Sequence, residues 1–368
     1  MKKTLLGTTA LVAVGLLAGP ALASDPLKVT VGGNVVTGFY VVDADDIGGT
    51  SFQDTKVAVV ARNIDIKAEG TLDNGLVAGV DAKLMLGSDW NTVDNGDATF
   101  RQLFGYLEGG FGRLEIGGTD GAAYKMHYTS PWFVPGNGVD SPNILNLPAT
   151  AVTTTGLRMS TFSLLATDSN KVSYFTPRLA GFQLGVSFTP EASQKNPYAN
   201  GLALVSTTVG DPSDVFEVAL NYAGTFGGVD LGLDGFYTSA DAVAASTDPE
   251  EYGFGANVGF AGFTLGGAYY KGSDITGSFT PLATSDQKVW TGGLKYATGP
   301  WTVGVAYINS ENETAGVTNK GDTWQLGGGY NLGSGVDIGL DLQKSTIDPA
   351  AGGSYDSQSA GIVLAIAF

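Results

Sequence analysis

The feature that most constrains the fold of this chain is a strict two-residue alternation between large apolar side chains and small or polar ones. In Trp290–Tyr296 the two aromatic residues stand six positions apart, with Gly292 and Leu294 on their face and Lys295 on the other. Successive side chains of a β-strand point to opposite faces, so this period predicts strands with one apolar face. The same aromatic spacing recurs at Phe182/Phe188, Phe216/Tyr222, Phe254/Phe260, Phe263/Tyr269, Trp301/Tyr307 and Trp324/Tyr330.

Aromatic residues at both ends of an aliphatic stripe are typical of strands that cross a membrane. Six residues span about 20 Å along a strand, which fits an apolar band about 25 Å tall when the strand is tilted. An array of extracellular β-sandwiches would also explain the alternation, but it gives the rings no reason to mark both ends of the stripe. Because lipid cannot satisfy a free strand edge, strands of this kind must close into a barrel.

The chain divides into sixteen such segments, separated by turns rich in Gly, Asn and Asp. We expect strands at 27–42, 55–72, 75–87, 99–109, 113–119, 170–177, 181–190, 214–225, 228–238, 251–261, 263–272, 287–297, 300–310, 320–331, 334–345 and 357–368. An even strand number fits a bacterial single-chain barrel, and sixteen strands enclose an aqueous channel. The predicted fold class is therefore all-β, a transmembrane antiparallel β-barrel formed by residues 24–368.

The first 23 residues have the build of a secretory signal peptide. Lys2 and Lys3 precede the largely apolar stretch 5–18, and Ala21 and Ala23 provide a small-residue cleavage site. We therefore expect residues 1–23 to be cleaved and the barrel to lie in the outer membrane of a bacterium. Loss of the two lysines leaves 17 basic residues against 36 acidic ones, so the formal charge moves from −17 to −19. Nucleic acid is not an expected partner of such an acidic chain.

The composition also disfavours catalysis. The chain has no cysteine and one histidine, His127, which removes disulfides, thiolate catalysis and zinc sites of the Cys/His kind. No candidate active residues stand out from the repeat, so we expect neither an enzyme nor a cofactor. His127 is either a titrating group of the channel or an ordinary loop histidine. Asp43, Asp45 and Asp46 form an acidic outer loop, which is either solvated surface charge or a weak calcium site that bridges to lipopolysaccharide.

Residues 119–169 form the longest stretch without sustained alternation. This stretch contains four prolines, among them Pro131 and Pro135, and large apolar residues such as Trp132 and Phe133. A loop that is so long and so apolar should pack against a surface instead of extending into water. Since the available surface in a wide barrel is the inner wall, we expect this stretch to fold into the pore and to constrict it.

Two stretches resemble the general diffusion porins of Gram-negative bacteria. They are Arg101–Gly118, which reads RQLFGYLEGGFGRLEIGG, and Asn170–Phe188, which reads NKVSYFTPRLAGFQLGVSF. The signal peptide and the terminal Phe368 agree with this resemblance. The resemblance implies a homotrimer, and it implies that a long third loop leaves the first motif, folds into the pore and returns at the second.

Several charged residues have the parity of the lumen face or lie in the long stretch. These candidate pore-lining residues are Lys28, Lys67, Lys83, Arg101, Arg113, Asp81, Glu115, Asp120 and Asp140. Opposite charges across a narrow aqueous pore create a transverse field that sorts solutes by charge. The chain departs from the family pattern at Tyr106 and Gly118, where glycine and arginine are common, and it has Thr167 and Asp168 where an arginine often stands. The usual ladder of basic residues is therefore incomplete here, and the acidic excess predicts a weak preference for cations.

We interpret the chain as an outer-membrane porin through which ions and small hydrophilic solutes diffuse passively, with membrane lipid and lipopolysaccharide around it. One alternative is a solute-specific channel in which aromatic residues of the long stretch line a sugar or peptide track. Another is a barrel that merely anchors an adhesin or a structural envelope protein. Saturable block by one solute would favour the first alternative, and a barrel without conductance would favour the second.

Overall fold

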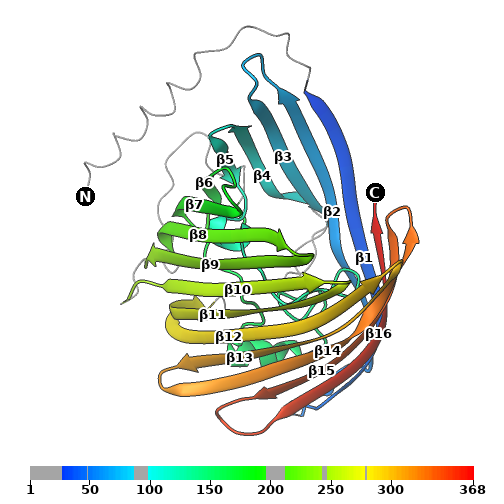
Figure 1. Cartoon of the computed structure of the whole chain (residues 1–368). Coiled ribbons are helices and arrows are strands. Elements are labelled where there is room, and N and C mark those ends of the chain that lie inside the picture. The colour runs from blue at the N-terminus through cyan, green and yellow to red at the C-terminus, as the bar shows by residue number, and fades with distance from the viewer. Residues whose placement is uncertain (1–26, 48, 87–97, 196–211, 243–246, 278–279) are drawn as a thin grey trace.

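The fold is taken from a computed structural model of the chain, which describes residues 27–47, 49–86, 98–195, 212–242, 247–277 and 280–368. The expected signal peptide, residues 1–23, lies outside the described residues. Sixteen antiparallel strands form one closed barrel, in which β1 pairs with β2 on one side and with β16 on the other (Figure 1). The expected fold class and strand number are confirmed.

The strands follow one another around the barrel in chain order. They are β1 (Lys28–Ala44), β2 (Thr55–Thr71), β3 (Val77–Leu86), β4 (Ala98–Gly109), β5 (Gly112–Gly118), β6 (Asn170–Phe175), β7 (Phe182–Glu191), β8 (Ser213–Phe226), β9 (Val229–Asp241), β10 (Glu250–Phe260), β11 (Phe263–Gly277), β12 (Thr280–Thr298), β13 (Trp301–Thr314), β14 (Val317–Gly333), β15 (Val336–Asp348) and β16 (Tyr355–Ala367). Tight connections such as Gly227-Gly228 alternate with longer ones, so one end of the barrel carries the short turns.

Strands β11 to β14 extend further from the short turns than the alternation predicts. The expected segments 287–297 and 300–310 are in fact Thr280–Thr298 and Trp301–Thr314, and their pairing continues to Asp286 opposite Glu313. In the part of β13 from Asn309 to Thr314 the residues on both faces are polar, so the apolar signal ends while the backbone ladder continues. Backbone hydrogen bonds require no apolar side chain, which explains the difference.

The two faces of the wall differ as the alternation predicts. Val303 is 51% exposed on the outer face, whereas Ala306 on the inner face is 2% exposed. Ring contacts on the outer face form two belts. One belt, near the short turns, includes Phe263 against Tyr296 at 4.5 Å, and the other includes Tyr307 against Trp324 at 4.6 Å between ring centroids. Aromatic belts at two heights of an apolar outer wall are the arrangement of a membrane-spanning barrel.

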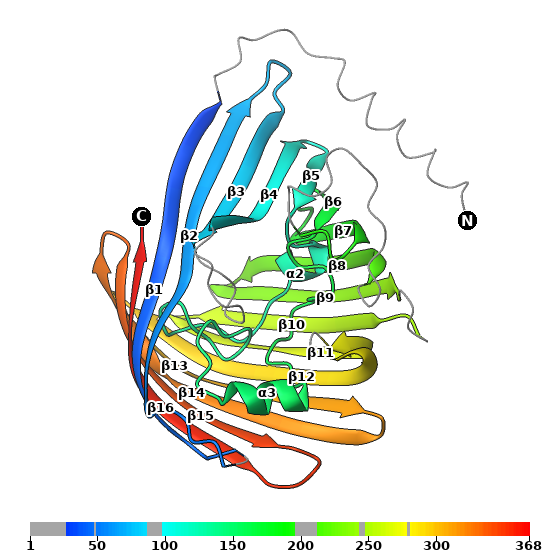
Figure 2. The ribbon, with the colours of Figure 1, turned by 180° about the vertical axis from the view of Figure 1, so that it is seen from behind.

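Two short helices, α2 (Ala122–Lys125) and α3 (Ala149–Thr155), lie between β5 and β6 in the chain. Figure 2 shows both helices inside the curve of the sheet, together with the coil that connects them. Neither helix, nor any other in the described part of the chain, is long and apolar enough to cross a membrane. The main apolar cluster of the molecule lies between this coil and the inner wall and includes Phe133, Ile144 and Tyr40.

Candidate functional site

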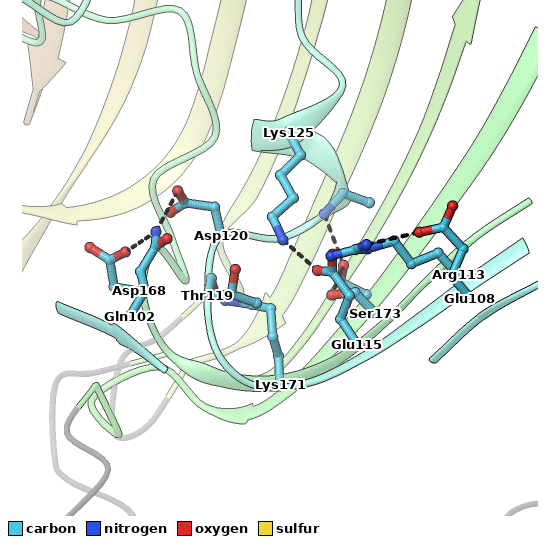
Figure 3. A network of polar contacts seen from close by, with 12 residues as sticks. Gln102, Glu108, Arg113, Glu115, Thr119, Asp120, Lys125, Asp168, Lys171 and Ser173 are labelled. Atoms are coloured by element: carbon cyan, nitrogen blue, oxygen red, sulfur yellow. Dashed lines mark hydrogen bonds and ion pairs between the residues drawn. The ribbon is translucent and has the colours of Figure 1, made fainter. Parts of the chain in front are cut away.

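The candidate site is the interior of the barrel, where residues 119–169, called here the inner segment, pack against the wall. Lys171 on β6 fastens the base of this segment. Its ammonium group is buried and donates hydrogen bonds to the backbone carbonyls of Thr119, Ala166 and Ser169. One side chain therefore holds the first and the last residues of the segment together. Figure 3 shows Lys171 beside Thr119.

The first turn of the inner segment is held by strands β7 and β8. The backbone N–H of Ala122 donates to Ser187 Oγ at 2.8 Å, and that of Ala123 donates to Glu217 Oε2 at 2.9 Å. The side-chain amide of Asn221 donates to the carbonyl of Met126 at 2.9 Å. Because the start of a helix leaves backbone N–H groups without partners, a wall carboxylate at this position stabilises it.

The middle of the segment is held by Asp341 on β15, whose carboxylate is fully buried. Asn137 donates to Asp341 Oδ2 at 2.8 Å, and Tyr40 on β1 donates to the same oxygen at 2.9 Å. Gln343 also donates to Oδ2 and Gln325 donates to Oδ1, both at 2.8 Å. Four donors around one carboxylate satisfy a group that would otherwise be costly to bury. Asp341 is thus the anchor of the segment on this part of the wall.

Glycines on the inner face let the backbone of the wall receive the segment. A Cβ at Gly304 would collide with the ring of Phe133, and a Cβ at Gly339 would collide with Pro135. The same alternation that places apolar side chains outward therefore places these glycines inward, where the segment needs room. Part of the high glycine content of the chain, 55 residues, thus has a direct packing role.

His127 ties the inner segment to strand β9. Its Nδ1 lies 2.9 Å from Asp234 Oδ2, and its Nε2 lies 3.0 Å from Thr161 Oγ1. Phe236 and Phe162 contact the imidazole edge to face, at 5.2 and 5.1 Å between centroids. The side chain has no exposed surface, so the interpretation as a channel-facing group is not supported. His127 is a packed and hydrogen-bonded residue of the segment.

The returning part of the segment is held on β10 and β11 by Arg158. Its guanidinium donates to Glu251 Oε1 at 3.1 Å and to Tyr270 Oη at 2.9 Å, and it lies 3.9 Å from the Tyr270 ring centroid. Ser163 donates to the other oxygen of Glu251 at 2.5 Å. A buried carboxylate is again paired and fully hydrogen-bonded, as burial of a charge requires.

The predicted charges on β1 to β3 meet as opposite pairs on the inner face. The strand register places Lys28 opposite Glu69, Lys67 opposite Asp81 and Lys83 opposite Asp65. Lys67 also forms a partly exposed ion pair with Glu69 at 2.8 Å. The lysines and acids that parity assigned to the lumen are therefore brought together on one part of the wall.

The predicted charges on β4 and β5 form a second group (Figure 3). Arg113 pairs with Glu108 at 2.9 Å and with Glu115 at 2.8 Å, and Lys125 of α2 also pairs with Glu115. The Arg113 guanidinium lies 3.7 Å from the ring centroid of Tyr106, a cation–π distance. Tyr106, which stands where the family commonly has glycine, therefore stabilises a cation on the inner wall.

The remaining predicted residues are Arg101 on β4, Asp120 near the start of the segment and Asp140 in its middle. Arg101 pairs with Asp168 at 2.7 Å, and Gln102 donates to Asp120 at 2.9 Å and to Asp168 at 2.6 Å. Burial raises the pKa of the Asp120 carboxyl, and the negative charge of Asp168 raises it further. Where the family often has an arginine, this chain thus has the acid Asp168, which pairs with Arg101.

Three carboxylates that we expected to line the pore are buried. Asp140 has no exposed surface and accepts hydrogen bonds from Thr129, from the backbone N–H of Thr161 and from the Thr161 hydroxyl. Glu115 and Asp120 are also buried. The expectation fails for Asp140 because its hydrogen bonds fold the segment upon itself, and the carboxylate does not face channel water.

Of the three acids expected in an outer loop, Asp45 and Asp46 follow β1, whereas Asp43 is still part of that strand and lies opposite Gln358. Asp45 accepts a hydrogen bond from the backbone N–H of Asp356 at 2.9 Å, which gives it a structural role. Within the described ranges, no three His, Asp or Glu side chains converge as metal ligands, and this includes Asp43, Asp45 and Asp46. Solvated surface charge and a weak calcium site therefore both stay predictions for this loop.

The sequence analysis did not identify the anchors Lys171, Glu217, Glu251 and Asp341 as site residues. All four are charged residues on the inner parity of their strands, and all four are buried by the segment. In the sequence, each of these residues could be recognised only as a single charge among small residues on the inward face of a strand. This pattern does not show which residue of a distant loop is its partner.

Comparison with known proteins identifies relatives of the whole chain. The profile described as Gram-negative porin matches residues 7–348. An outer membrane porin protein of Bordetella pertussis is 26% identical over 351 residues, which cover 89% of this chain and 85% of that protein.

Two solved structures share the fold. An anion-selective porin from Comamonas acidovorans has a TM-score of 0.61 at 18% identity and covers 93% of this chain and 100% of its own. The outer-membrane-expressed OmpT of Vibrio cholerae has a TM-score of 0.62 at 13% identity and covers 95% of this chain and 100% of its own. At these identities the structural likeness shows the fold.

Proposed function

Because the chain belongs to the family of Gram-negative porins, whose members are outer-membrane channels, we propose that its inner segment narrows the channel to a passage for ions and small hydrophilic solutes. Family and fold are those of a non-enzymatic channel.

One observation carries the proposal: the segment is bonded to opposite sides of the barrel. Ala123 is bonded to Glu217 on β8, and Asn137 is bonded to Asp341 on β15. In the closed ring of sixteen strands, β8 and β15 are seven steps apart in one direction and nine in the other. A segment that reaches between nearly opposite walls occupies part of the cross-section, and a narrower aqueous path restricts solutes by size.

The charges support a weak preference for cations. Acidic residues exceed basic ones in this chain by 17, and the inner charges on β1 to β5 are mostly paired with opposite charges. The Comamonas protein is an anion-selective porin, so the expected cation preference rests on the charges of this chain and not on the barrel. Here the excess negative charge would attract cations into the mouths.

Single-channel recording in planar bilayers tests both parts of the proposal. Deletion of residues 132–145, the middle of the segment, should raise the conductance and admit larger neutral solutes. Reversal potentials in a salt gradient should favour the cation for the unaltered protein. An unchanged conductance after the deletion would refute the constriction, and an anion-selective reversal potential would refute the charge argument.

We further propose that the protein is a homotrimer in which the outer face of β1 to β5 contacts the next subunit. The aromatic ring contacts of the belts lie on β7 to β14, whereas the outer face of β1, β2 and β5 presents mostly aliphatic residues such as Val31, Val57 and Ile116, with Phe39 outside these ring contacts. Belts mark contact with the membrane interface, so a wall without a continuous belt of contacting rings fits a protein neighbour. In-vitro folded OmpT of Vibrio cholerae, which shares the fold, has a trimer form. Native mass spectrometry in detergent tests this assignment, and a monomer mass at all concentrations would refute it.

A further inference from the structure

Two lysines stand directly opposite each other on the outer face of the wall. The register of β11 and β12 pairs Lys271 with Lys288. Their outward direction follows from Tyr269 and Trp290, which lie two residues away on the same strands and belong to the outer face. Both lysines therefore point away from the channel, unlike the lysines of the inner wall.

Within the described part of the chain, neither lysine has a carboxylate within ion-pair distance. Side chains directly opposite on two antiparallel strands have Cβ atoms about 5 Å apart, where like charges repel each other. Glu311, the residue opposite Lys288 on β13, is engaged with Lys320 at 3.0 Å. The row across β11 to β14 thus holds three lysines and one acid, Glu311, which gives it a net positive charge in a chain whose formal charge is −17.

Other charged groups lie one step further from the belt. Glu250, Asp286 and Glu313 follow two residues beyond the lysine row on β10, β12 and β13, and Asp286 accepts a hydrogen bond from the backbone N–H of Asp274 at 3.3 Å. Two residues along a strand correspond to about 7 Å. The basic row is therefore nearer the membrane than the acidic row.

The height of the lysines fits the headgroups of the outer leaflet. Trp290 contacts Tyr307 in the belt away from the short turns, and Lys288 follows two residues further in the same direction. Aromatic belts lie at the boundary between hydrocarbon and headgroups. Because the short turns of such barrels face the periplasm, this belt is on the outer side, and the lysines reach the level of lipid phosphates.

We propose that Lys271 and Lys288 together bind a phosphate of the phosphorylated glycolipid that forms the outer leaflet. This inference rests on the proposed function, because it requires the barrel to sit in the outer membrane. A dianionic phosphate between the two ammonium groups replaces their repulsion with two charge-assisted hydrogen bonds. The acyl chains of the same lipid would contact the aromatic belt below.

The test uses the purified full-length mature protein in detergent and bisphosphorylated lipid A as the probe, with EDTA present so that cation bridges to the acidic row are absent. Native mass spectrometry counts the bound lipid and yields an affinity. The double variant Lys271→Gln/Lys288→Gln should bind about 30-fold more weakly, since each lysine near anionic lipid contributes about fivefold. Lys271→Arg/Lys288→Arg should retain the affinity.

The matched control is Lys28→Gln/Lys83→Gln, which removes the same charge from the inner wall and should bind as the parent does. Equal binding by the outer and inner double variants would overturn the proposal, and so would equal affinity of the parent for lipid A that has lost its phosphates. Conductance in planar bilayers is measured on the same variants. If the outer double variant loses lipid binding but keeps normal conductance, the result supports this site. An absence of conductance in the parent would refute the proposed channel, but it would not affect the comparison of lipid binding between the variants.

Discussion

Asn137 of the inner segment donates a 2.8 Å hydrogen bond to Asp341 on β15, a carboxylate that also accepts hydrogen bonds from three residues of the wall. These two residues are 204 positions apart in the chain. The bond therefore joins the segment to a strand formed from the last part of the sequence. It makes the position of the segment depend on closure of the barrel.

Substitution of Asp341 should release the segment. Asp341→Ala leaves Tyr40, Asn137, Gln325 and Gln343 as buried donors without their acceptor, which we expect to lower the free energy of unfolding by about 4 kcal/mol. Urea unfolding in detergent measures this loss, and bilayer recordings should show a noisier channel. Asp337→Ala on the same strand is the control, because its bond to Asn331 is exposed and should contribute less than about 0.5 kcal/mol. Equal losses in the two variants would contradict the anchoring role.

Glycine on the inner face should be required where the segment touches the wall. Gly304→Val places a side chain where the Phe133 ring lies, and we expect overpacking to cost about 1 to 3 kcal/mol. Gly292→Val on the neighbouring strand is the matched control, since a Cβ there meets no atom within 4 Å. Urea midpoints of the two variants make the comparison. If valine changes the urea midpoint equally at both positions, glycine on the inner face is not required for the segment to pack against the wall.

The alternation predicts the strands well because one local rule, that apolar side chains point outward, applies to every strand of the wall. It places Val303 outward and Gly304 inward without knowledge of any long-range contact. It fails at the upper ends of β13 and β14, where Glu311 and Asn312 make both faces polar and only backbone pairing continues. In that region the ladder, which has no side-chain signature, determines the strand length.

The site could be predicted only in part. Parity correctly assigns Arg113 and Lys67 to the inner face, because this depends on the same local rule. It cannot show that Asp140 is buried, since that follows from how Thr129 and Thr161 fold around it. It also cannot pair His127 with Asp234, which lies 107 residues away. Contacts between a loop and a distant wall are set by three-dimensional packing, and the period of the strands carries no record of them.

Stability should depend on pH through Asp120. Burial, with the charge of Asp168 beside it, raises the pKa of this carboxyl in the folded state above its ordinary value of about 3.9. A raised acid pKa means that the stabilising contribution is present below that ordinary value and is lost as the pH rises through the folded value. The parent should therefore lose stability relative to Asp120→Asn between pH 4 and neutrality.

Urea midpoints of the parent and Asp120→Asn at both ends of this pH range give the comparison. The asparagine variant keeps an oxygen that can accept from Gln102, so the two proteins should differ least at the acidic end. A gap that is constant with pH, or one that grows on acidification, would show that Asp120 is not the responsible group.

The outward direction of the alternating residues can be measured one position at a time, because the chain has no cysteine to compete for a label. Nitroxide labels at Val303→Cys and Val305→Cys should collide with oxygen dissolved in lipid far more often than with a water-soluble nickel complex, since both positions face outward. Thr302→Cys, which shares the inward parity of Gly304, should show the reverse order. The difference between neighbouring positions is decisive, because a soluble sandwich would bury the valines away from both reagents. A label at Val303 that reports the nickel complex as strongly as the label at Thr302 would exclude a membrane-facing outer wall.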